Sequence, residues 1–314
     1  MKCLIVDVVD PIIGQDLGKY MEVETKILPT QEELIGMIGD VDVLVMRVDP
    51  KISKEVLDAA KNLKVIAVCS VGTNHIDLEA AKAKGVEVMN APGMSANAVA
   101  ELTISKMLDM ARDTMKANYD VKIKHEWNKY NFGNGSELRG HTVGIMGFGR
   151  IGRRVGELAR AFGMKVIAYD PYLKPEDFEK ENAVGMSVEE LLKEADYVTI
   201  HVPLTDETRN LVSKESIATM KDTAVVLNMS RGGIVNEQDM YEALKAGTIG
   251  GYASDVLENE IKVGGLTGND EFISPLFECD RFIISPHIGA QSLDAQHDIG
   301  VYIVGKIEEA LKLK

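Results

Sequence analysis

Short hydrophobic runs alternate with segments of helical spacing along the chain. In the first ninety residues, four runs rich in β-branched residues predict strands at 2–8, 41–46, 64–69 and 86–90. The segments between them have one-sided helical spacing, at 32–39, 53–61 and 77–85. Because strands that alternate with helices usually pair in parallel, this pattern predicts an α/β domain.

A second alternating series begins after residue 140. Its predicted strands are 142–147, 165–170, 197–202, 224–229, 250–256 and 282–287. Its predicted helices lie near 151–162, 187–194, 213–220 and 237–246. Two such series within 314 residues predict two parallel-sheet domains.

A long helix and a polar segment connect the two series. Hydrophobic positions from about 96 to 116 form a one-sided stripe, which predicts the helix. Residues 116–140 are polar and hold the only tryptophan, so we interpret them as a linker or arm. Trp127 then either packs locally or contacts another subunit. Residues 298–314 have helical spacing, so we expect the chain to close on a helix.

Composition and charge exclude several classes of protein. The net charge of −14 argues against a nucleic-acid or anionic-membrane surface as partner. Three cysteines without a CxxC pair predict neither disulfides nor a metal site, and they favour a reducing, cytoplasmic location. The sequence contains no run of 18 apolar residues, so we expect no membrane-spanning helix. The N-terminal apolar run is too short for a signal peptide.

The first candidate site is a glycine-rich loop between a predicted strand and a predicted helix. Gly147, Gly149 and Gly152 form G-x-G-x-x-G, which in this context is typical of dinucleotide binding. The helix N-terminus supplies N–H groups for a pyrophosphate. Asp170 ends the next predicted strand, where it can accept hydrogen bonds from ribose hydroxyls and repel a 2′-phosphate. The loop therefore predicts NAD rather than NADP as cofactor.

Two further candidates follow predicted strands, where ligands bind in open α/β sheets. Arg231 offers a planar fork for a carboxylate, and an ion pair at a helix start is the alternative. His287 can exchange a proton near neutral pH, although a lone histidine is more often structural. The acids Asp255, Glu258 and Glu260 lie close together, and such a run is usually a solvated face.

Taken together, the motifs resemble those of the D-isomer-specific 2-hydroxyacid dehydrogenase family, which includes phosphoglycerate dehydrogenases, glyoxylate/hydroxypyruvate reductases and D-lactate dehydrogenases. The resemblance covers nearly the whole chain. The matching blocks are 70–81, 90–103, 147–152, 201–212, 228–237, 253–260 and 285–292.

This resemblance implies two doubly wound parallel-sheet domains, with a Rossmann NAD domain inserted into a flavodoxin-like substrate domain. The implied substrate domain is 1–95 plus 289–314, and the implied NAD domain is 96–288. Segment 116–140 becomes the arm of a homodimer. The active site is expected in the cleft between the domains.

The resemblance also implies the roles of individual residues. Arg231, Glu260 and His287 would be catalytic: His287 exchanges the hydroxyl proton, Glu260 orients the imidazole and Arg231 holds the substrate carboxylate. Asp255 would lie near the nicotinamide carboxamide, and Glu258 would be solvated. The implied NAD-binding residues are Gly147, Gly149, Arg150, Ile151, Gly152, Asp170, Val202, Pro203, Thr208, Met229, Ser230, Asp255 and Gly289. The implied substrate-binding residues are Arg47, Val71, Gly72 and Arg231.

The sequence departs from the family pattern in two places. The proline expected after Glu260 is Ile261, and Leu257 replaces the usual phenylalanine. In the early substrate loop, Arg47 is followed by Val48 and Asp49, and the carboxylate of Asp49 would repel a phosphate. The substrate is therefore either 3-phosphoglycerate, hydroxypyruvate or glyoxylate, or a similar small 2-hydroxy or 2-keto acid. We expect no appended regulatory domain after Lys314.

Two alternatives share the fold. Formate and phosphite dehydrogenases are the first, and the formate enzymes typically pair their histidine with glutamine, so Glu260 argues against them. NAD-sensing corepressors are the second, and the lack of long tails or a basic patch argues against them.

Overall fold

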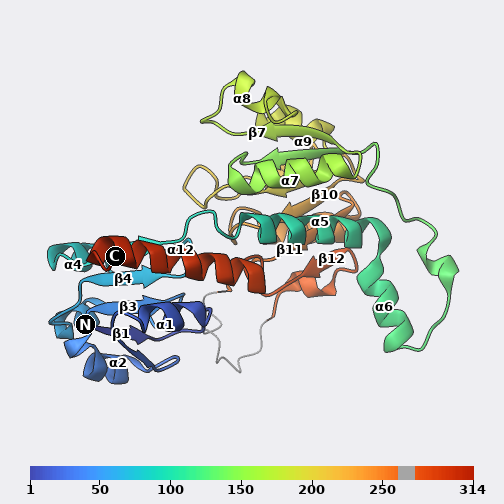
Figure 1. Cartoon of the computed structure of the whole chain (residues 1–314). Coiled ribbons are helices and arrows are strands. Elements are labelled where there is room, and N and C mark those ends of the chain that lie inside the picture. Colours follow the sequence, from blue (N-terminus) through green and yellow to red (C-terminus); the bar gives the residue numbers. More distant parts are fainter. Residues whose placement is uncertain (261–272) are drawn as a thin grey trace. The chain divides into compact units, whose positions relative to one another are not determined.

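The computed structural model describes residues 1–260 and 273–314 and divides the chain into two compact units. Unit 1 contains Met1–Ser95 and Ala290–Lys314, and unit 2 contains Ala96–Gly289. Each unit has one sheet, and every pairing of strands in both sheets is parallel. The predicted α/β fold class, with two parallel sheets, is confirmed (Figure 1).

Unit 1 has a five-stranded sheet in the order β2-β1-β3-β4-β5. Its strands are β1 (Lys2–Ile5), β2 (Glu22–Thr25), β3 (Val43–Met46), β4 (Val65–Val68) and β5 (Glu87–Asn90). The strands β3 and β4 are buried throughout, because helices cover both faces of the sheet. The edge strand β2 is mostly polar and has no buried residue, which explains why the hydrophobic pattern did not predict it.

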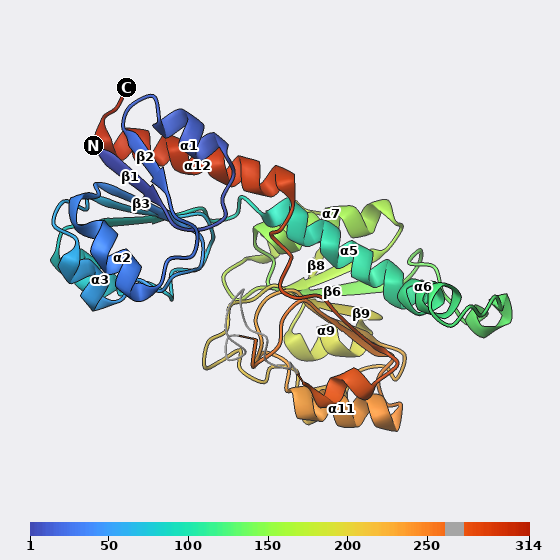
Figure 2. The same cartoon turned by 90° about the horizontal axis from the view of Figure 1, so that it is seen from below.

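The helices of unit 1 form a layer on each face of its sheet. Helices α1 (Ile12–Leu17) and α12 (Leu293–Leu311) share one hydrophobic cluster and lie side by side (Figure 2). The opposite cluster contains residues of α2 (Gln31–Met37), η1 (Ile38–Asp40), α3 (Lys54–Ala59) and α4 (Leu78–Ala83). The predicted C-terminal helix is therefore part of the unit that the N-terminal strands build.

Unit 2 has a seven-stranded sheet in the order β12-β11-β10-β9-β6-β7-β8. Its strands are β6 (Thr142–Met146), β7 (Lys165–Tyr169), β8 (Val184–Gly185), β9 (Tyr197–Ile200), β10 (Val225–Asn228), β11 (Gly251–Ser254) and β12 (Phe282–Ile284). The chain winds outward from β6 through β7 and β8 and then from β9 to β12. The change of direction creates a switch point beyond β6 and β9, where such sheets bind their ligands.

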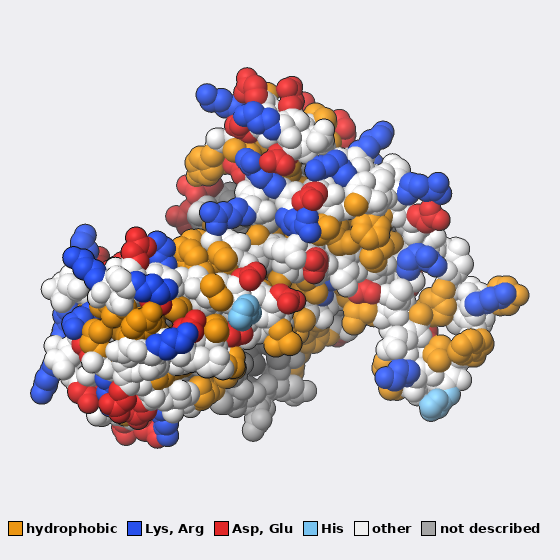
Figure 3. Space-filling model, viewed as in Figure 1, with side chains coloured by type: hydrophobic (Ala, Val, Ile, Leu, Met, Phe, Trp, Pro, Cys, Tyr) orange, Lys and Arg blue, Asp and Glu red, His pale blue; other side chains and the backbone are white. Residues whose placement is uncertain are grey.

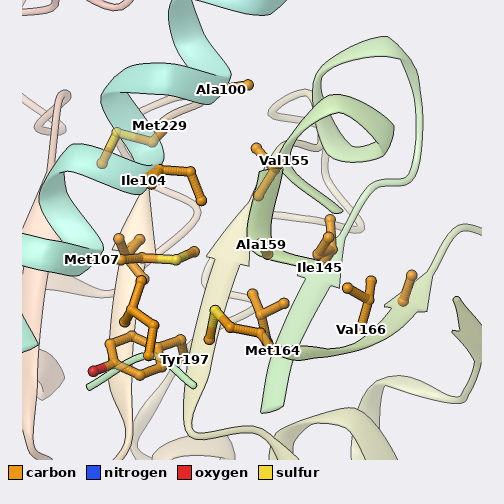
Figure 4. Packing of buried hydrophobic residues seen from close by; sticks show 14 of the residues in the cluster. Ala100, Ile104, Met107, Ile145, Val155, Ala159, Met164, Val166, Tyr197 and Met229 are labelled. Carbon is orange, nitrogen blue, oxygen red and sulfur yellow. The ribbon is translucent and has the colours of Figure 1, made fainter. Parts of the chain in front are cut away.

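Two hydrophobic clusters cover the faces of this sheet. One contains residues of α5 (Ala96–Arg112) and α7 (Arg150–Ala161), and Figure 4 shows Ile104 and Met107 facing Ile145, Met164 and Tyr197. The other contains residues of α9 (Val188–Glu194), α10 (Lys214–Ile217) and α11 (Glu237–Ala246). The remaining elements are α6 (Thr114–Lys122), η2 (Lys129–Phe132), α8 (Pro175–Glu179) and η3 (Pro275–Glu278).

The long connecting helix differs from its prediction. Instead of running from 96 to 116, it stops at Arg112, and Asp113 adopts a left-handed conformation with φ 51°. Helix α6 then begins at Thr114, so the predicted linker 116–140 starts as a helix. The carboxylate of Asp113 accepts a hydrogen bond from the guanidinium of Arg281, which secures the bend. This bend directs α6 away from the sheet of unit 2 (Figure 1).

Candidate active site

The glycine-rich loop lies between β6 and α7, beside the switch point of the unit 2 sheet. Gly147 has φ 89°, and a β-carbon on it would lie 2.8 Å from the carbonyl of His201. A β-carbon on Gly152 would lie 2.2 Å from the oxygen of Gly147, so only glycine lets the helix pack on its own loop. A β-carbon on Gly149 would meet no atom within 4 Å, which leaves the backbone open to a ligand. Arg150 and Ile151 form the first turn of α7.

Asp170 directly follows β7. Its hydrogen bond to the glycine loop connects that loop to the end of β7. Its carboxylate oxygens accept the N–H groups of Phe148 and Tyr172, each at 3.0 Å. Each oxygen retains acceptor capacity, because an ionised carboxylate has about four acceptor positions. The negative charge is therefore fixed beside the loop, where a second anionic group would be repelled.

The segment after β9 borders the same loop. Val202 is buried, and the hydroxyl of Thr208 donates to the Pro203 oxygen at 2.6 Å and accepts the Thr205 N–H at 2.8 Å. These hydrogen bonds stabilise the turn formed by residues 203–208. Burial lowers the pKa of His201 to about 3, and its Nε2 lies 2.9 Å from the Thr199 hydroxyl. His201 is therefore neutral and does not compete with His287 as a proton carrier.

Arg231 is presented by a tight turn after β10. The buried side chain of Asn228 donates to the Arg231 oxygen at 2.9 Å and accepts the Ser230 N–H at 3.1 Å. The Ser230 hydroxyl donates to the Val202 oxygen, which ties this turn to the segment after β9. Met229 instead points into the core under α5 (Figure 4). The guanidinium of Arg231 is exposed, and its one described hydrogen bond goes to the Ser230 oxygen at 2.7 Å.

Glu260 and His287 form a pair at the carboxyl edge of the same sheet. The Glu260 Oε1 lies 3.1 Å from the His287 Nδ1, and Nε2 has no partner among the described residues. The histidine side chain is 48% exposed, and its backbone is left-handed with φ 54°. Histidine tolerates this conformation better than most residues, but it still requires a well-anchored loop. A carboxylate on one ring nitrogen fixes the imidazole orientation and leaves the other nitrogen for substrate.

Asp255 is the anchor of the loop that carries His287. The side chain is 2% exposed, and its Oδ1 accepts the Ile288 N–H at 3.0 Å together with the Ser285 hydroxyl. Its Oδ2 accepts the Gly289 N–H at 2.7 Å. Three of its roughly four acceptor positions are thus used inside the loop. Of the two neighbouring acids, Glu258 is exposed, as predicted from the sequence, and Glu260 faces the histidine.

The predicted substrate residues of unit 1 follow β3 and β4. In the buried carboxylate of Asp7, the Oδ2 atom accepts three backbone N–H groups, those of Arg47, Val48 and Asp49, at 2.7–3.1 Å. Burial lowers the pKa of Arg47, and the negative charge of Asp7 opposes this effect. The guanidinium donates to the Gln291 side chain at 2.7 Å.

The second backbone segment of unit 1 is held beside the Arg47 turn. The Ser70 hydroxyl lies 3.0 Å from the Arg47 oxygen and 3.3 Å from the Gly72 oxygen. The Asn90 side chain donates to the Val71 oxygen at 2.7 Å. The N–H groups of Val71 and Gly72 form no hydrogen bond within the described ranges, so both can bind an anion.

Three further expectations concern the residue after Glu260, a metal site and a membrane span. The departure at Ile261 lies outside the described residues. Within the described ranges, no group of three or more His, Cys, Asp or Glu side chains could hold a metal ion. No described helix is long and apolar enough to cross a membrane.

Comparison with known proteins identifies the family. The model for the NAD-binding domain of D-isomer specific 2-hydroxyacid dehydrogenases matches residues 104–289, more than half of the chain. The chain belongs to this dehydrogenase family. The resemblance seen in the sequence is confirmed, and so is NAD as the cofactor of the matched domain.

Relatives in the family carry different substrate names. The chain is 41% identical to a D-3-phosphoglycerate dehydrogenase of Methanocaldococcus jannaschii over 99% of its length, but it spans only 58% of that relative. It is 40% identical to a hydroxypyruvate reductase of Thermotoga maritima, with 90% of this chain and 88% of the relative covered. A structure of D-lactate dehydrogenase from Aquifex aeolicus with NAD and lactic acid superposes with a TM-score of 0.82, at 30% identity, over 99% and 95% of the two chains.

The residues of this chain fit NAD. The open backbone at Gly149 and the N-terminus of α7 provide donors for a pyrophosphate, and the carboxylate of Asp170, held by the Phe148 N–H, provides acceptors for ribose hydroxyls. His201 and Val202 border the glycine loop; the turn 203–208 follows them, and the Ser230 hydroxyl ties the turn 228–231 to Val202. These are the residues that would hold the cofactor.

Several residues that organise the site were not predicted from the sequence. Asp7, Asn228 and Ser285 each anchor a turn that carries a candidate residue. Glu237, in the first turn of α11, accepts the Glu258 N–H at 2.6 Å. Three of them lie at or just after strand ends and Glu237 begins a helix, and only their three-dimensional contacts distinguish them from ordinary turn and helix-start residues.

Proposed function

We propose that the protein is an NAD-dependent oxidoreductase that interconverts a D-2-hydroxy acid and the corresponding 2-keto acid. The observation that carries this proposal is the Glu260–His287 pair, 3.1 Å apart, on the sheet that also carries the glycine loop. The pair offers a proton acceptor with one ring nitrogen free. The glycine loop supplies the NAD site in the same unit.

In this proposal His287, Glu260 and Arg231 have distinct chemical tasks. The Nε2 of His287 takes the proton from the C2 hydroxyl during oxidation and returns it during reduction. Glu260 holds the imidazole orientation and stabilises its charged form. The exposed guanidinium of Arg231 binds the substrate carboxylate and polarises the C2 oxygen. Bound NAD supplies the hydride acceptor.

The substrate is a small 2-hydroxy or 2-keto acid, and the family names leave a choice among 3-phosphoglycerate, hydroxypyruvate or glyoxylate, and lactate. The free N–H groups of Val71 and Gly72 support a carboxylate in unit 1. Arg47 supplies a further positive charge, and the nearby carboxylates of Asp7 and Asp49 oppose a doubly charged phosphate. We therefore favour a non-phosphorylated acid such as hydroxypyruvate or glyoxylate.

A screen of NADH oxidation tests both the proposed reaction and the proposed choice of substrate. The substrates are glyoxylate, hydroxypyruvate, pyruvate, 2-oxoglutarate and phosphohydroxypyruvate. We expect turnover with at least one of them and the highest kcat/KM for a non-phosphorylated acid. His287→Ala should lower kcat by roughly 10²–10⁴-fold while NADH still binds. An unchanged kcat in this variant, or no turnover of any 2-keto acid by the parent protein, would refute the catalytic assignment.

We further propose a homodimer in the cytoplasm, formed through the segment from α6 to 140. Among the described residues of unit 2, this segment carries the most exposed aromatic side chains other than Tyr172, with Trp127 88% and Tyr130 83% exposed. Figure 3 shows hydrophobic side chains gathered on it. Gel filtration with light scattering should give twice the chain mass of 34.4 kDa. Trp127→Ala with Tyr130→Ala should shift the protein to a monomer, and a monomeric parent would contradict the proposal.

A further inference from the structure

The described part of the turn that presents Glu260 has a support from outside itself. Residues 258–260 form a turn after the buried Leu257, and inside this turn the Glu260 N–H bonds to the Leu257 oxygen at 3.2 Å. Glu258 is exposed and offers no packing. The carboxylate of Glu260 must nevertheless stay within 3.1 Å of the His287 Nδ1.

The outside support comes from the start of α11. The Oε1 of Glu237 accepts the Glu258 N–H at 2.6 Å, two residues before Glu260. The connection between β10 and α11 also lies against the start of the turn 258–260. A β-carbon on Gly232, in this connection, would lie 2.2 Å from the Leu257 oxygen. One side chain and one backbone contact therefore fix where the turn begins.

The charge on Glu237 is not explained by an ion pair. Burial raises its pKa above the usual range, the Glu258 N–H lowers it, and the negative charges of Glu258 and Glu260 raise it further. No lysine, arginine or histidine pairs with Glu237 in the part of the chain that the structure describes.

Among the described residues, the cations of the elements packed against α11, such as Lys214 of α10, form no ion pair with Glu237. The other ionisable groups of these elements include Tyr252 of β11, which feels the charge of Glu237, and Glu278 of η3, whose carboxylate accepts a hydrogen bond from the Tyr241 hydroxyl. In α10, the backbone N–H of Lys214 bonds to Asp239. A half-buried carboxylate beside two like charges is unfavourable for stability alone, so a role in the site accounts for it better than a role in helix capping.

We infer that Glu237 is a positioning residue for the acid–base pair: its carboxylate fixes the turn that presents Glu260, and its negative charge adds to that of Glu260 on His287. This inference rests on the proposed function, because it gives Glu237 a task only if Glu260 and His287 exchange the substrate proton. Glu237 touches neither substrate nor reacting atoms and acts through Glu260.

Two substitutions separate the hydrogen bond from the charge. Glu237→Ala removes both and should lower kcat about tenfold, since small displacements of a catalytic group are costly, while KM for NADH stays unchanged. Glu237→Gln keeps an acceptor for the Glu258 N–H and should restore most of kcat. Because it removes a negative charge, it should move the pH midpoint of kcat down by roughly 0.3–0.5 units. Glu242→Gln, an exposed charge removal on the same helix, should change neither kcat nor the midpoint.

A double-mutant cycle decides whether the effect passes through Glu260. In a Glu260→Ala background, Glu237→Ala should cause no further loss of kcat, because the group that it positions is gone. An equal loss in both backgrounds would overturn the inference, and so would a Glu237→Gln profile identical to that of the parent. Thermal unfolding of each variant identifies those that fail to fold. If His287→Ala retains full activity, the proposed function fails instead, independently of this result.

Discussion

Asp255 lies beneath the loop that carries His287, and its removal should disturb both stability and catalysis. The structure allows the cost to be worked out bond by bond. In Asp255→Asn one carboxylate oxygen becomes an NH2 group, so one of the N–H groups of Ile288 and Gly289 loses its acceptor. The Ser285 hydroxyl can rotate to accept instead. A buried donor left unsatisfied costs about 1–3 kcal/mol, so we expect a loss of about 2 kcal/mol.

This loss can be measured by calorimetry on the intact protein. For a unit of this size, about 2 kcal/mol corresponds to a decrease of roughly 4–8 °C in Tm. Because His287 loses its fixed backbone, kcat should fall about 100-fold at saturating NADH. Asp280→Asn, an exposed acid just before β12, is the matched control and should leave both quantities within error.

Three outcomes would refute this reasoning in different ways. If Asp255→Asn keeps the parental Tm and kcat, the loop does not depend on the three hydrogen bonds. If only the Tm falls, the carboxylate stabilises the fold but not the position of His287. If KM for NADH rises while the Tm is unchanged, Asp255 contacts the cofactor, as the family resemblance implies, more strongly than it holds the loop.

Three other changes test the cofactor loop and its surroundings. Gly152→Ala forces a β-carbon against the Gly147 oxygen and should cost about 1–3 kcal/mol and weaken NADH binding in a fluorescence titration; Gly36→Ala, with no atom within 4 Å, should bind NADH normally. Asp170→Ala removes the repulsion of a 2′-phosphate, so the ratio of kcat/KM for NADPH to that for NADH should rise about tenfold in steady-state assays, and an unchanged ratio would contradict the assignment. Because burial lowers the pKa of His201 to about 3, its stabilising effect is complete above the unfolded pKa of about 6.5 and is lost as pH falls. Between pH 7.5 and 5 the parent should lose about 2 kcal/mol that His201→Gln does not lose, and equal losses in urea unfolding would refute this.

The sequence predicted the elements whose signal is local and strong. Strands β3, β4 and β9 are buried at every position, so their hydrophobic runs were unambiguous. By contrast, β2 is an edge strand with polar residues, and β8 has two exposed residues. Their pairing partners, β1 and β7, determine them, and a single local window does not contain those partners.

The candidate site shows the same division between local and tertiary information. Arg231 and His287 could be identified from the sequence as candidate site residues, because each follows a predicted strand. The three acids between 255 and 260 look alike in the sequence, yet Asp255 is buried, Glu258 is exposed and Glu260 faces a histidine. Which acid is buried depends on where β11 and β12 pair, so their roles became distinguishable only in the folded chain.

The three proposed catalytic side chains of unit 2 are held in the same way. Each proposed catalytic side chain of unit 2 is displayed on a turn after a parallel strand, and each turn is anchored by another polar residue: Asn228 for Arg231, Glu237 for Glu260 and Asp255 for His287. Packing fixes an exposed or half-exposed side chain only in part. Hydrogen bonds from a buried or half-buried neighbour can fix its backbone instead. The rigidity of the proposed site should therefore depend on these three anchors more than on the hydrophobic core beneath them.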